Sequence, residues 1–200
     1  MILFLYILGI ILILNNLGTV LFSLIYSCII YPKQIKPFLK ISEDVLVGVF
    51  VPCKGIDDNM ENNLRAFMDQ DYKNFRVTFI TESNEDPAVE VIKKVMKDYK
   101  NAYHVVSGRT QYCCQKNHNL LKGIKSDNDS KVIVIADADV CPSNVWLKNI
   151  ILPIMNDFNH VSTGFRWLDP YKASFFGTIH SMLNSYLFCL MPATKGVWGG

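Results

Sequence analysis

Hydrophobic residues along the chain form short β-branched runs that alternate with stretches of helical periodicity. The runs predict strands over residues 45–52, 75–80, 103–106 and 132–135. Between them, apolar side chains recur three and four residues apart, which is the spacing of one face of an α-helix. Strands that alternate with helices favour βαβ units, and therefore an α/β fold with a mostly parallel sheet and helices on both of its faces.

Capping residues predict where the helices begin. Asp57 or Asp58 is expected to cap the first helix, and Glu61, three residues after Asp58, would complete a capping box. Asp86 is expected to cap the second helix, which has a proline in its first turn. Ser143 is expected to cap a later helix that carries a tryptophan near its start.

The chain is less regular after the third predicted strand. A polar loop is expected over residues 108–117, with a helix after it, and residues 160–165 are expected to form a further strand. Residues 171–191 have few charges and a broad apolar face interrupted by small polar residues. That pattern is typical of a helix at a membrane interface, and an ordinary core helix is the alternative.

The run over residues 132–135 leads directly into Asp137 and Asp139. Because every residue of the run is β-branched, the strand is predicted to be buried on both faces at the centre of the sheet. Open parallel sheets bind ligands beyond the carboxyl ends of their strands, and carboxylates buried there need a cation to stay ionised. Mg²⁺ or Mn²⁺ is the expected cation, since hard divalent ions prefer carboxylate and phosphate oxygens. Two solvated aspartates at a strand end are the alternative.

A parallel sheet gathers the carboxyl ends of its strands along one edge, and polar residues follow several of the predicted strands. The residues expected at this edge are Lys54, Glu82, Lys116, Asp137 and Asp139. The chain contains neither a G-x-G-x-x-G nor a Walker A sequence, so the classical dinucleotide and P-loop sites have no support. For each lysine, a solvated surface position is the alternative to a binding role.

Residues 1–30 contain no charged side chain, and lysines follow soon after them. This stretch exceeds the roughly 20 apolar residues that a helix needs to cross a bilayer. We therefore expect an uncleaved transmembrane anchor over residues 1–31, a linker over residues 32–44, and a globular domain over residues 45–200. The positive-inside rule places that domain in the cytosol, at a Golgi or ER membrane in a eukaryote or at the plasma membrane in a bacterium. A buried core helix is the alternative for the first segment.

Composition supports this division of the chain and excludes one class of partner. A length of 200 residues suits one domain plus a membrane segment, and a hydrophobic content of 50% is high for a soluble protein. A net charge of +2 provides no basic field for nucleic acid. The 6 cysteines show no CxxC or zinc-ligand spacing, so they are interpreted as free thiols of a reducing compartment.

Several segments, taken in order, resemble the ceramide glucosyltransferase-like glycosyltransferases of the GT-A class (family 21, family 2 type). Residues 49–55, VFVPCKG, are similar to a first-strand P-x-K-G segment, and residues 63–88 are similar to the run from first helix to second strand. QKNHNL at residues 115–120 resembles a P-K-x-N-N-L element, with glutamine in place of the usual proline. IADADV at 135–140 resembles the metal motif, and VWGG at 197–200 a tryptophan-glycine segment.

The resemblance implies an inverting transferase that moves a hexose, glucose first, from a UDP-sugar to a lipid hydroxyl. Ceramide is the first acceptor it implies, with diacylglycerol, a sterol-like lipid or another sphingoid base left open. Asp139 is the implied direct metal ligand, and Asp137 lies beside the ribose or the metal. Lys54 and Glu82 are implied near the nucleoside, and Lys116 near the phosphate or uridine. Trp198 and Gly199 are implied on the acceptor side.

In the family, the general base is a third aspartate, and a Q/R-x-x-R-W motif follows it. Both are expected beyond Gly200, so the chain is interpreted as truncated at its C-terminus. Two alternatives stay open at this point. One is a catalytically inactive fragment that binds nucleotide sugar or lipid, and the other is a polysaccharide synthase of the same superfamily.

Overall fold

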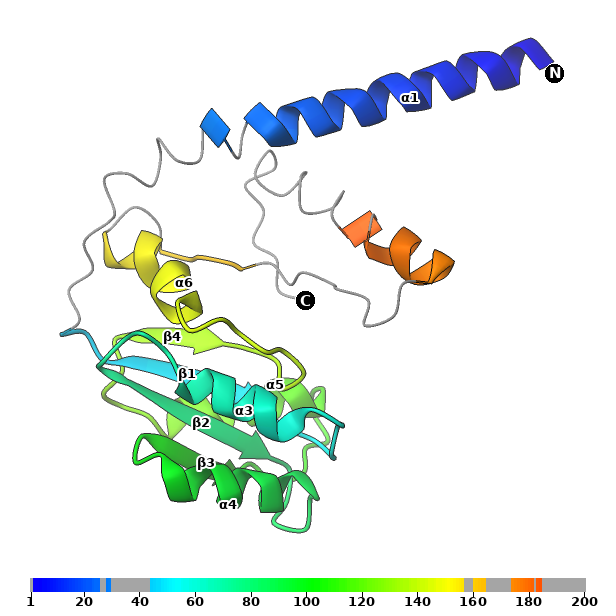
Figure 1. Ribbon diagram of the computed structural model, residues 1–200. Coiled ribbons are helices and arrows are strands. Elements are labelled where there is room, and N and C mark those ends of the chain that lie inside the picture. Colours follow the sequence, from blue (N-terminus) through cyan, green and yellow to red (C-terminus); the bar gives the residue numbers. More distant parts are fainter. Residues whose placement is uncertain are drawn as a thin grey trace. The chain divides into compact units, whose positions relative to one another are not determined.

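The computed structural model describes residues 2–25, 28–29, 44–156, 160–164, 174–181 and 183–184. The chain divides into two compact units. One is Ile41–Met155, and the other combines Met1–Lys40 with Asn156–Gly200. The sheet lies in the unit Ile41–Met155 (Figure 1).

The strands of this unit are β1 (Val47–Pro52), β2 (Phe75–Thr81), β3 (Ala102–Val106) and β4 (Val132–Ile135). Within the described residues they form one sheet of order β3-β2-β1-β4, and every neighbouring pair is parallel. The predicted parallel sheet is therefore confirmed, and each strand lies where its hydrophobic run predicted it.

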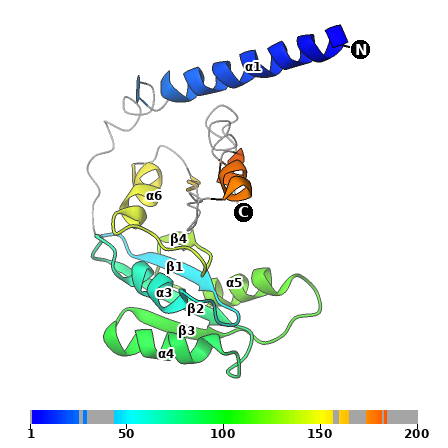
Figure 2. The ribbon, with the colours of Figure 1, turned by 45° about the vertical axis from the view of Figure 1, so that its right-hand side comes forward.

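Helices cover both faces of the sheet, as predicted (Figures 1 and 2). They are α3 (Met60–Met68), α4 (Ala88–Asp98), α5 (Gln115–Lys125) and α6 (Trp146–Met155). Buried side chains of α3, α4 and α6 join one core with alternate residues of the strands, including Val49 of β1 and Val77 of β2. The other face of the sheet is covered by α5, whose Gly123 lies directly over Phe50 and Ile80.

The close approach of α5 depends on the absence of a side chain at Gly123. A Cβ at this position would lie 2.8 Å from atoms of the Ile80 side chain. The buried residues of α5 are Asn119 and Gly123, whereas Leu121 is exposed. The helix also begins at Gln115, so the predicted polar loop over residues 108–117 was too long and Lys116 lies in the first helical turn.

The prediction that residues 132–135 form a central strand buried on both faces was wrong. Among the described strands, β4 pairs only with β1 and therefore forms an edge of the sheet. Val132 and Val134 are buried in the core, but Ile133 and Ile135 on the opposite face are about half exposed. A fully apolar run is compatible with an edge strand, because one face is enough to bury half of its side chains.

Two predicted helix caps were wrong, and a third is confirmed. The residue before α3 is Asn59, whose side chain makes no capping bond, and Glu61 pairs instead with Arg65 and Lys94. At α4, Asp86 Oδ1 accepts the Ala88 N–H at 2.9 Å, as predicted.

At α6, the side chain that binds the free backbone N–H comes from Gln70 rather than from Ser143. Gln70 Oε1 accepts the Leu147 N–H at 2.9 Å, and its Nε2 donates to Ser143 O at 3.0 Å. Ser143 contributes only backbone atoms, since its carbonyl also accepts the Trp146 N–H at 3.0 Å. The cap of α6 is therefore supplied by the segment that follows α3.

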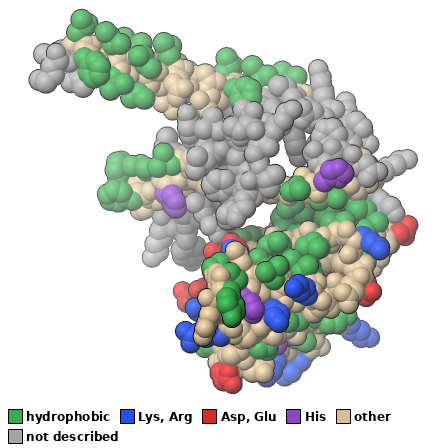
Figure 3. Space-filling model, turned by 180° about the vertical axis from the view of Figure 1, so that it is seen from behind, with side chains coloured by type: hydrophobic (Ala, Val, Ile, Leu, Met, Phe, Trp, Pro, Cys, Tyr) green, Lys and Arg blue, Asp and Glu red, His purple; other side chains and the backbone are tan. Residues whose placement is uncertain are grey.

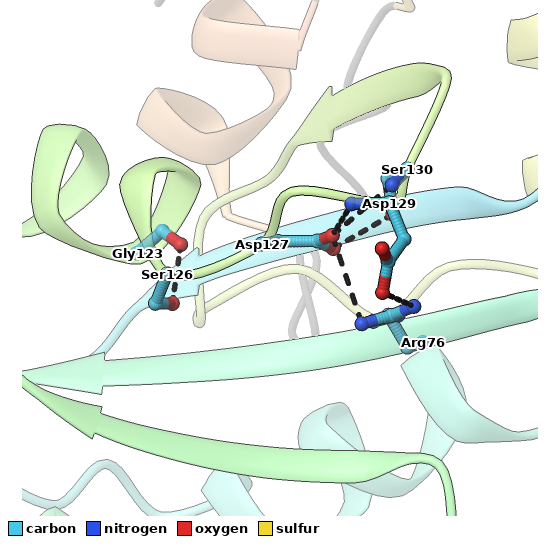
Figure 4. Close-up of polar contacts among 6 residues, drawn as sticks. All are labelled: Arg76, Gly123, Ser126, Asp127, Asp129 and Ser130. Carbon is cyan, nitrogen blue, oxygen red and sulfur yellow. Dashed lines mark hydrogen bonds and ion pairs between the residues drawn. The ribbon is translucent and has the colours of Figure 1, made fainter.

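A polar cluster fixes the connection between α5 and β4 (Figure 4). The Asp127 carboxylate is only 3% exposed and accepts the Ser130 Oγ–H at 2.7 Å, the Ser130 N–H at 3.1 Å and the Asp129 N–H at 3.0 Å. Arg76 of β2 lies 3.6 Å from Asp127 and 3.1 Å from the exposed Asp129. Burial opposes ionisation of Asp127, but the bonds from Ser130 and Asp129, with Arg76 nearby, hold its pKa below the ordinary value.

The second unit contains α1 (Ile2–Ile25), whose surface is largely hydrophobic (Figure 3). Most of its leucine, isoleucine and phenylalanine side chains are exposed. Within the described part of the chain, no helix has the combination of length and apolar character that crossing a membrane requires.

The C-terminal part of this unit is described over residues 156, 160–164, 174–181 and 183–184. Residues 160–164 contain no strand, so the strand predicted over residues 160–165 was wrong for that described part. Residues 175–181 and 183–184 are helical, and Phe175, Phe176 and Leu183 are exposed. The remainder of the predicted helix over residues 171–191 lies outside the described residues.

We expect Asp127→Ala to lower the free energy of unfolding by about 1–3 kcal/mol, because it removes a buried carboxylate that accepts hydrogen bonds from Ser130 and Asp129. The matched change Asp129→Ala removes an exposed carboxylate and should cost about 1 kcal/mol or less. Urea unfolding of the two variants measures the difference.

The pH dependence of the free energy of unfolding tests the same Asp127 contacts in a second way. Since the folded pKa of Asp127 is lowered, its stabilising contribution is present above the unfolded value of about 4 and is lost as the pH falls through the folded value. The acid loss of stability should therefore be shallower in Asp127→Ala than in the parent chain. Equal stability of both variants would contradict the assignment.

Candidate functional site at the carboxyl edge of the sheet

Backbone hydrogen bonds between adjacent strands align their carboxyl ends. The Cys53 N–H donates to Ile80 O at 2.7 Å, and the Ala136 N–H donates to Phe50 O at 3.1 Å. The residues that follow β1, β2 and β4 therefore leave the sheet at the same edge. This arrangement is the reason why Lys54, far from Asp137 in the sequence, lies on the same edge of the domain.

The two aspartates lie in a turn directly after β4. The Val140 N–H donates to Asp137 O at 3.3 Å and closes this turn, and Asn63 Nδ2 of α3 donates to Ala138 O at 3.3 Å. The Asp137 side chain is 30% exposed and Asp139 is exposed. The expectation of buried carboxylates was therefore wrong, because β4 is an edge strand and its end opens to solvent.

Lys116 makes a direct contact with one of these two aspartates. Its Nζ lies 2.6 Å from Asp137 Oδ1, and the side chains are 50% and 30% exposed, respectively. The contact joins the first turn of α5 to the end of β4, so it crosses from one layer of the domain to the sheet. Of the residues predicted for this edge, Lys116 and Asp137 are in contact.

Glu82 is joined to the loop after β3 through its backbone. The Gly108 N–H donates to Glu82 O at 3.1 Å, and Gly108 has φ 75°, a left-handed conformation that glycine adopts without strain. One residue earlier, the Ser107 N–H donates to Thr81 O at 2.9 Å. The structure thus places Glu82 beside the segment that leads to Lys116, with the Glu82 side chain partly buried.

Lys54 lies in the sharp turn after β1 and is exposed. Gly55, with φ 67°, follows it, and its N–H donates to Asp86 Oδ1 at 2.9 Å. Asp86 therefore fixes this turn and the start of α4 together. Within the described part of the chain, the Lys54 side chain makes no ion pair and is available to a ligand.

Cys53, next to Lys54, is not a candidate nucleophile. Burial, together with the nearby Asp86 carboxylate, raises the pKa of its thiol to about 12. The thiol therefore stays protonated at neutral pH. The predicted free thiols are confirmed for the described cysteines, which are Cys28, Cys53, Cys113, Cys114 and Cys141.

A polar clamp holds the first turn of α5, and the sequence did not predict it. Gln115 Nε2 donates to Gly108 O at 2.8 Å and to Asn119 Oδ1 at 2.7 Å, while its Oε1 accepts the Thr110 N–H at 3.1 Å. The buried Ser107 Oγ–H donates to Asn119 Oδ1 at 2.6 Å. The amide of Gln115, which stands where the resembled family has proline, was the available signal for such a contact.

The chemistry of the two aspartates fits a magnesium or manganese ion that shares its ligands with a substrate. Among the described residues, no three His, Cys, Asp or Glu side chains gather closely enough to hold a metal ion. Mg²⁺ commonly uses one or two carboxylates and completes its shell with water and substrate phosphates. Asp137 and Asp139 would therefore hold such an ion with a diphosphate. The implied acceptor-side residues Trp198 and Gly199 lie outside the described residues.

Comparison with known proteins relates the chain to glycosyltransferases. The sequence model of glycosyl transferase family 21 matches residues 14–175. Ceramide glucosyltransferase 1 of Caenorhabditis elegans is 23% identical over 146 residues, which is 68% of this chain and 31% of that protein. Ceramide glucosyltransferase of Komagataella phaffii is 38% identical over 53 residues, or 26% of this chain and 10% of that protein. The chain thus spans about a third of the length of the first relative.

One solved structure with a similar chain is a mannosyltransferase from Pyrobaculum calidifontis in complex with GDP-Man and Mn²⁺. The TM-score is 0.41 and the identity 19%, over 63% of this chain and 40% of that one.

We expect Gln115→Ala to release the loop over residues 108–114, because the change removes the amide that binds Gly108 and Thr110 in the first part of the loop. Trypsin should cleave after the exposed Arg109 roughly fivefold faster, since at least one net hydrogen bond of about 1 kcal/mol opposes opening. The matched control is Gln111→Ala, which removes an exposed amide from the same loop. Equal cleavage rates in the two variants would contradict the clamp.

Proposed function

The chain belongs to glycosyl transferase family 21, and from that premise we propose that it is an inverting hexosyltransferase of the GT-A class. The donor is a UDP-sugar, with glucose as the first candidate, and the acceptor is a lipid hydroxyl, with ceramide first. The observation that carries the proposal is the carboxylate turn after β4 with Lys116 bound to Asp137. Names of relatives support the sugar and lipid, since two of them are ceramide glucosyltransferases.

The donor diphosphate is the group that this edge of the sheet suits best. Asp139 and Asp137 are proposed to hold the cation, which when bound neutralises negative charge on the leaving diphosphate. Lys116 is proposed to bind a phosphate oxygen from the first turn of α5. Lys54 and Glu82 are proposed to face the nucleoside. The Lys54 turn is fixed by the bond from the Gly55 N–H to the Asp86 carboxylate, and the Glu82 carbonyl accepts the Gly108 N–H at the same edge of the sheet.

The proposed step is a direct displacement. The acceptor hydroxyl oxygen forms a bond to the anomeric carbon while the bond from that carbon to the diphosphate oxygen breaks, so UDP leaves with the bonding electron pair. A general base takes the hydroxyl proton. We assign none of the described residues to the role of this base.

The lipid acceptor is supported by apolar surface outside the sheet. The side chains exposed on α1 are mostly leucine and isoleucine, and Phe175 and Phe176 are exposed on the helix over residues 175–181. We propose that residues 1–31 anchor the protein in a membrane, with the α/β domain on the cytosolic side. We propose that residues 171–191 lie at the interface. A donor site held close to the bilayer would reach a lipid headgroup.

We expect the full chain in detergent to bind UDP with Mn²⁺ and to transfer glucose from UDP-glucose to ceramide. Asp139→Asn should abolish transfer and weaken Mn²⁺-dependent UDP binding at least tenfold, because it removes a metal carboxylate. Asp129→Asn makes the same change at an exposed site after α5 and should leave both unchanged.

Transfer that is equal in Asp139→Asn and in the parent chain would contradict the proposed metal role. UDP binding without any transfer, in the parent chain, would favour the catalytically inactive nucleotide-sugar-binding fragment. Radiolabelled lipid product and isothermal titration with UDP measure these two quantities separately.

The proposed topology can be tested at the sequon over residues 128–130, Asn-Asp-Ser. With the domain in the cytosol, synthesis into microsomes should give no endoglycosidase-sensitive mass shift and a pellet that resists alkaline carbonate. As a positive control, a secretory leader in place of residues 1–31 should produce the shift, and Asn128→Gln should remove it. A shift in the unaltered chain would place the domain in the lumen.

A further inference from the structure

Lys116 occupies one of the two carboxylates that the proposed metal needs. The Lys116 Nζ lies 2.6 Å from Asp137 Oδ1. Among the described residues, Lys116 is the ion-pair partner of Asp137. Both cations, the ammonium and a divalent metal, would use the same carboxylate oxygens. Because like charges repel strongly at such short range, the lysine and the metal compete for Asp137.

The helix that carries Lys116 is fixed, whereas the lysine side chain is free to move. Gln115 and Asn119, on either side of Lys116 in the sequence, are bound to each other and to residues after β3. Close packing at Gly123 also holds α5 against the sheet. The Lys116 side chain is 50% exposed, so its flexible stem can swing away from Asp137 without movement of the helix.

A diphosphate offers Lys116 an alternative anion. When a nucleotide diphosphate binds at this edge, its oxygens attract the ammonium group and leave Asp137 to the metal. We propose that Lys116 acts as a resident counter-ion of Asp137, which keeps the metal site weak until the donor nucleotide is present. This inference rests on the proposed function, and it adds that metal and donor bind cooperatively through the movement of one lysine.

The consequence is a coupling free energy between the binding of the metal and the binding of the nucleotide. This coupling is larger than the direct contact between metal and phosphate alone provides. Such coupling is reciprocal, so bound metal also raises the affinity for the nucleotide by the same factor. Removal of the lysine has two opposite effects. It increases metal affinity when no nucleotide is present, and it decreases the gain that the nucleotide produces.

The test measures Mn²⁺ binding to the full chain in detergent, by electron paramagnetic resonance of the free ion, with and without UDP. We expect Lys116→Met to bind Mn²⁺ roughly fivefold or more tightly than the parent chain when UDP is absent, in the usual range of coupling factors. The gain in Mn²⁺ affinity on addition of UDP should fall by the same factor. Lys116→Arg keeps the positive charge and should retain the weak binding of the parent chain.

Lys122→Met is the matched control, since it removes an exposed lysine from the same helix without touching Asp137. It should bind Mn²⁺ as the parent chain does. Unchanged Mn²⁺ affinity in Lys116→Met without UDP, or an equal increase in Lys122→Met, would overturn the inference while the proposed function stands. If the folded parent chain binds neither Mn²⁺ nor UDP, the proposed function fails and the inference fails with it.

Discussion

The burial of β1 on both faces is the constraint on which the rest of the domain depends. Val47, Val49 and Val51 are fully buried on the face covered by α3 and α4, and Phe50 is buried on the face covered by α5. Since β1 pairs with β2 on one side and β4 on the other, its register determines where both neighbours end. A slip by one residue would turn the valines towards the face covered by α5, turn Phe50 towards the face covered by α3 and α4, and shift Lys54 relative to the aspartate turn.

This constraint explains which parts of the fold could be predicted. A strand with two covered faces needs apolar side chains at nearly every position, so β1 and β2 could be recognised from their sequences alone. The sequence of β4, Val-Ile-Val-Ile, has the same character, yet Ile133 and Ile135 are half exposed. Whether an apolar strand is central or lies at an edge depends on neighbours far away in the sequence, and a local pattern contains no information on them.

The same distinction applies to the candidate site. Lys54, Glu82 and the aspartates could be assigned to one edge because parallel strands bring their carboxyl ends together. The polar contacts that hold them were not predicted, because each depends on a specific partner in the folded chain. Gln70 binds the start of α6 from 77 positions away. Gln115 likewise forms hydrogen bonds to the loop after β3, with Gly108 and Thr110.

Two acid–base pairs connect the layers of the domain at separate places, and burial gives them different roles. The Asp127 side chain is 3% exposed and accepts hydrogen bonds from three donors of its own turn. Its carboxylate is therefore held in place beside Arg76. The Asp137 and Lys116 side chains are 30% and 50% exposed, and water replaces either partner at little cost. A pair of the first kind stabilises the fold because its partners are fixed. A pair of the second kind can exchange partners, and this is what a site that must accept both a cation and an anion requires.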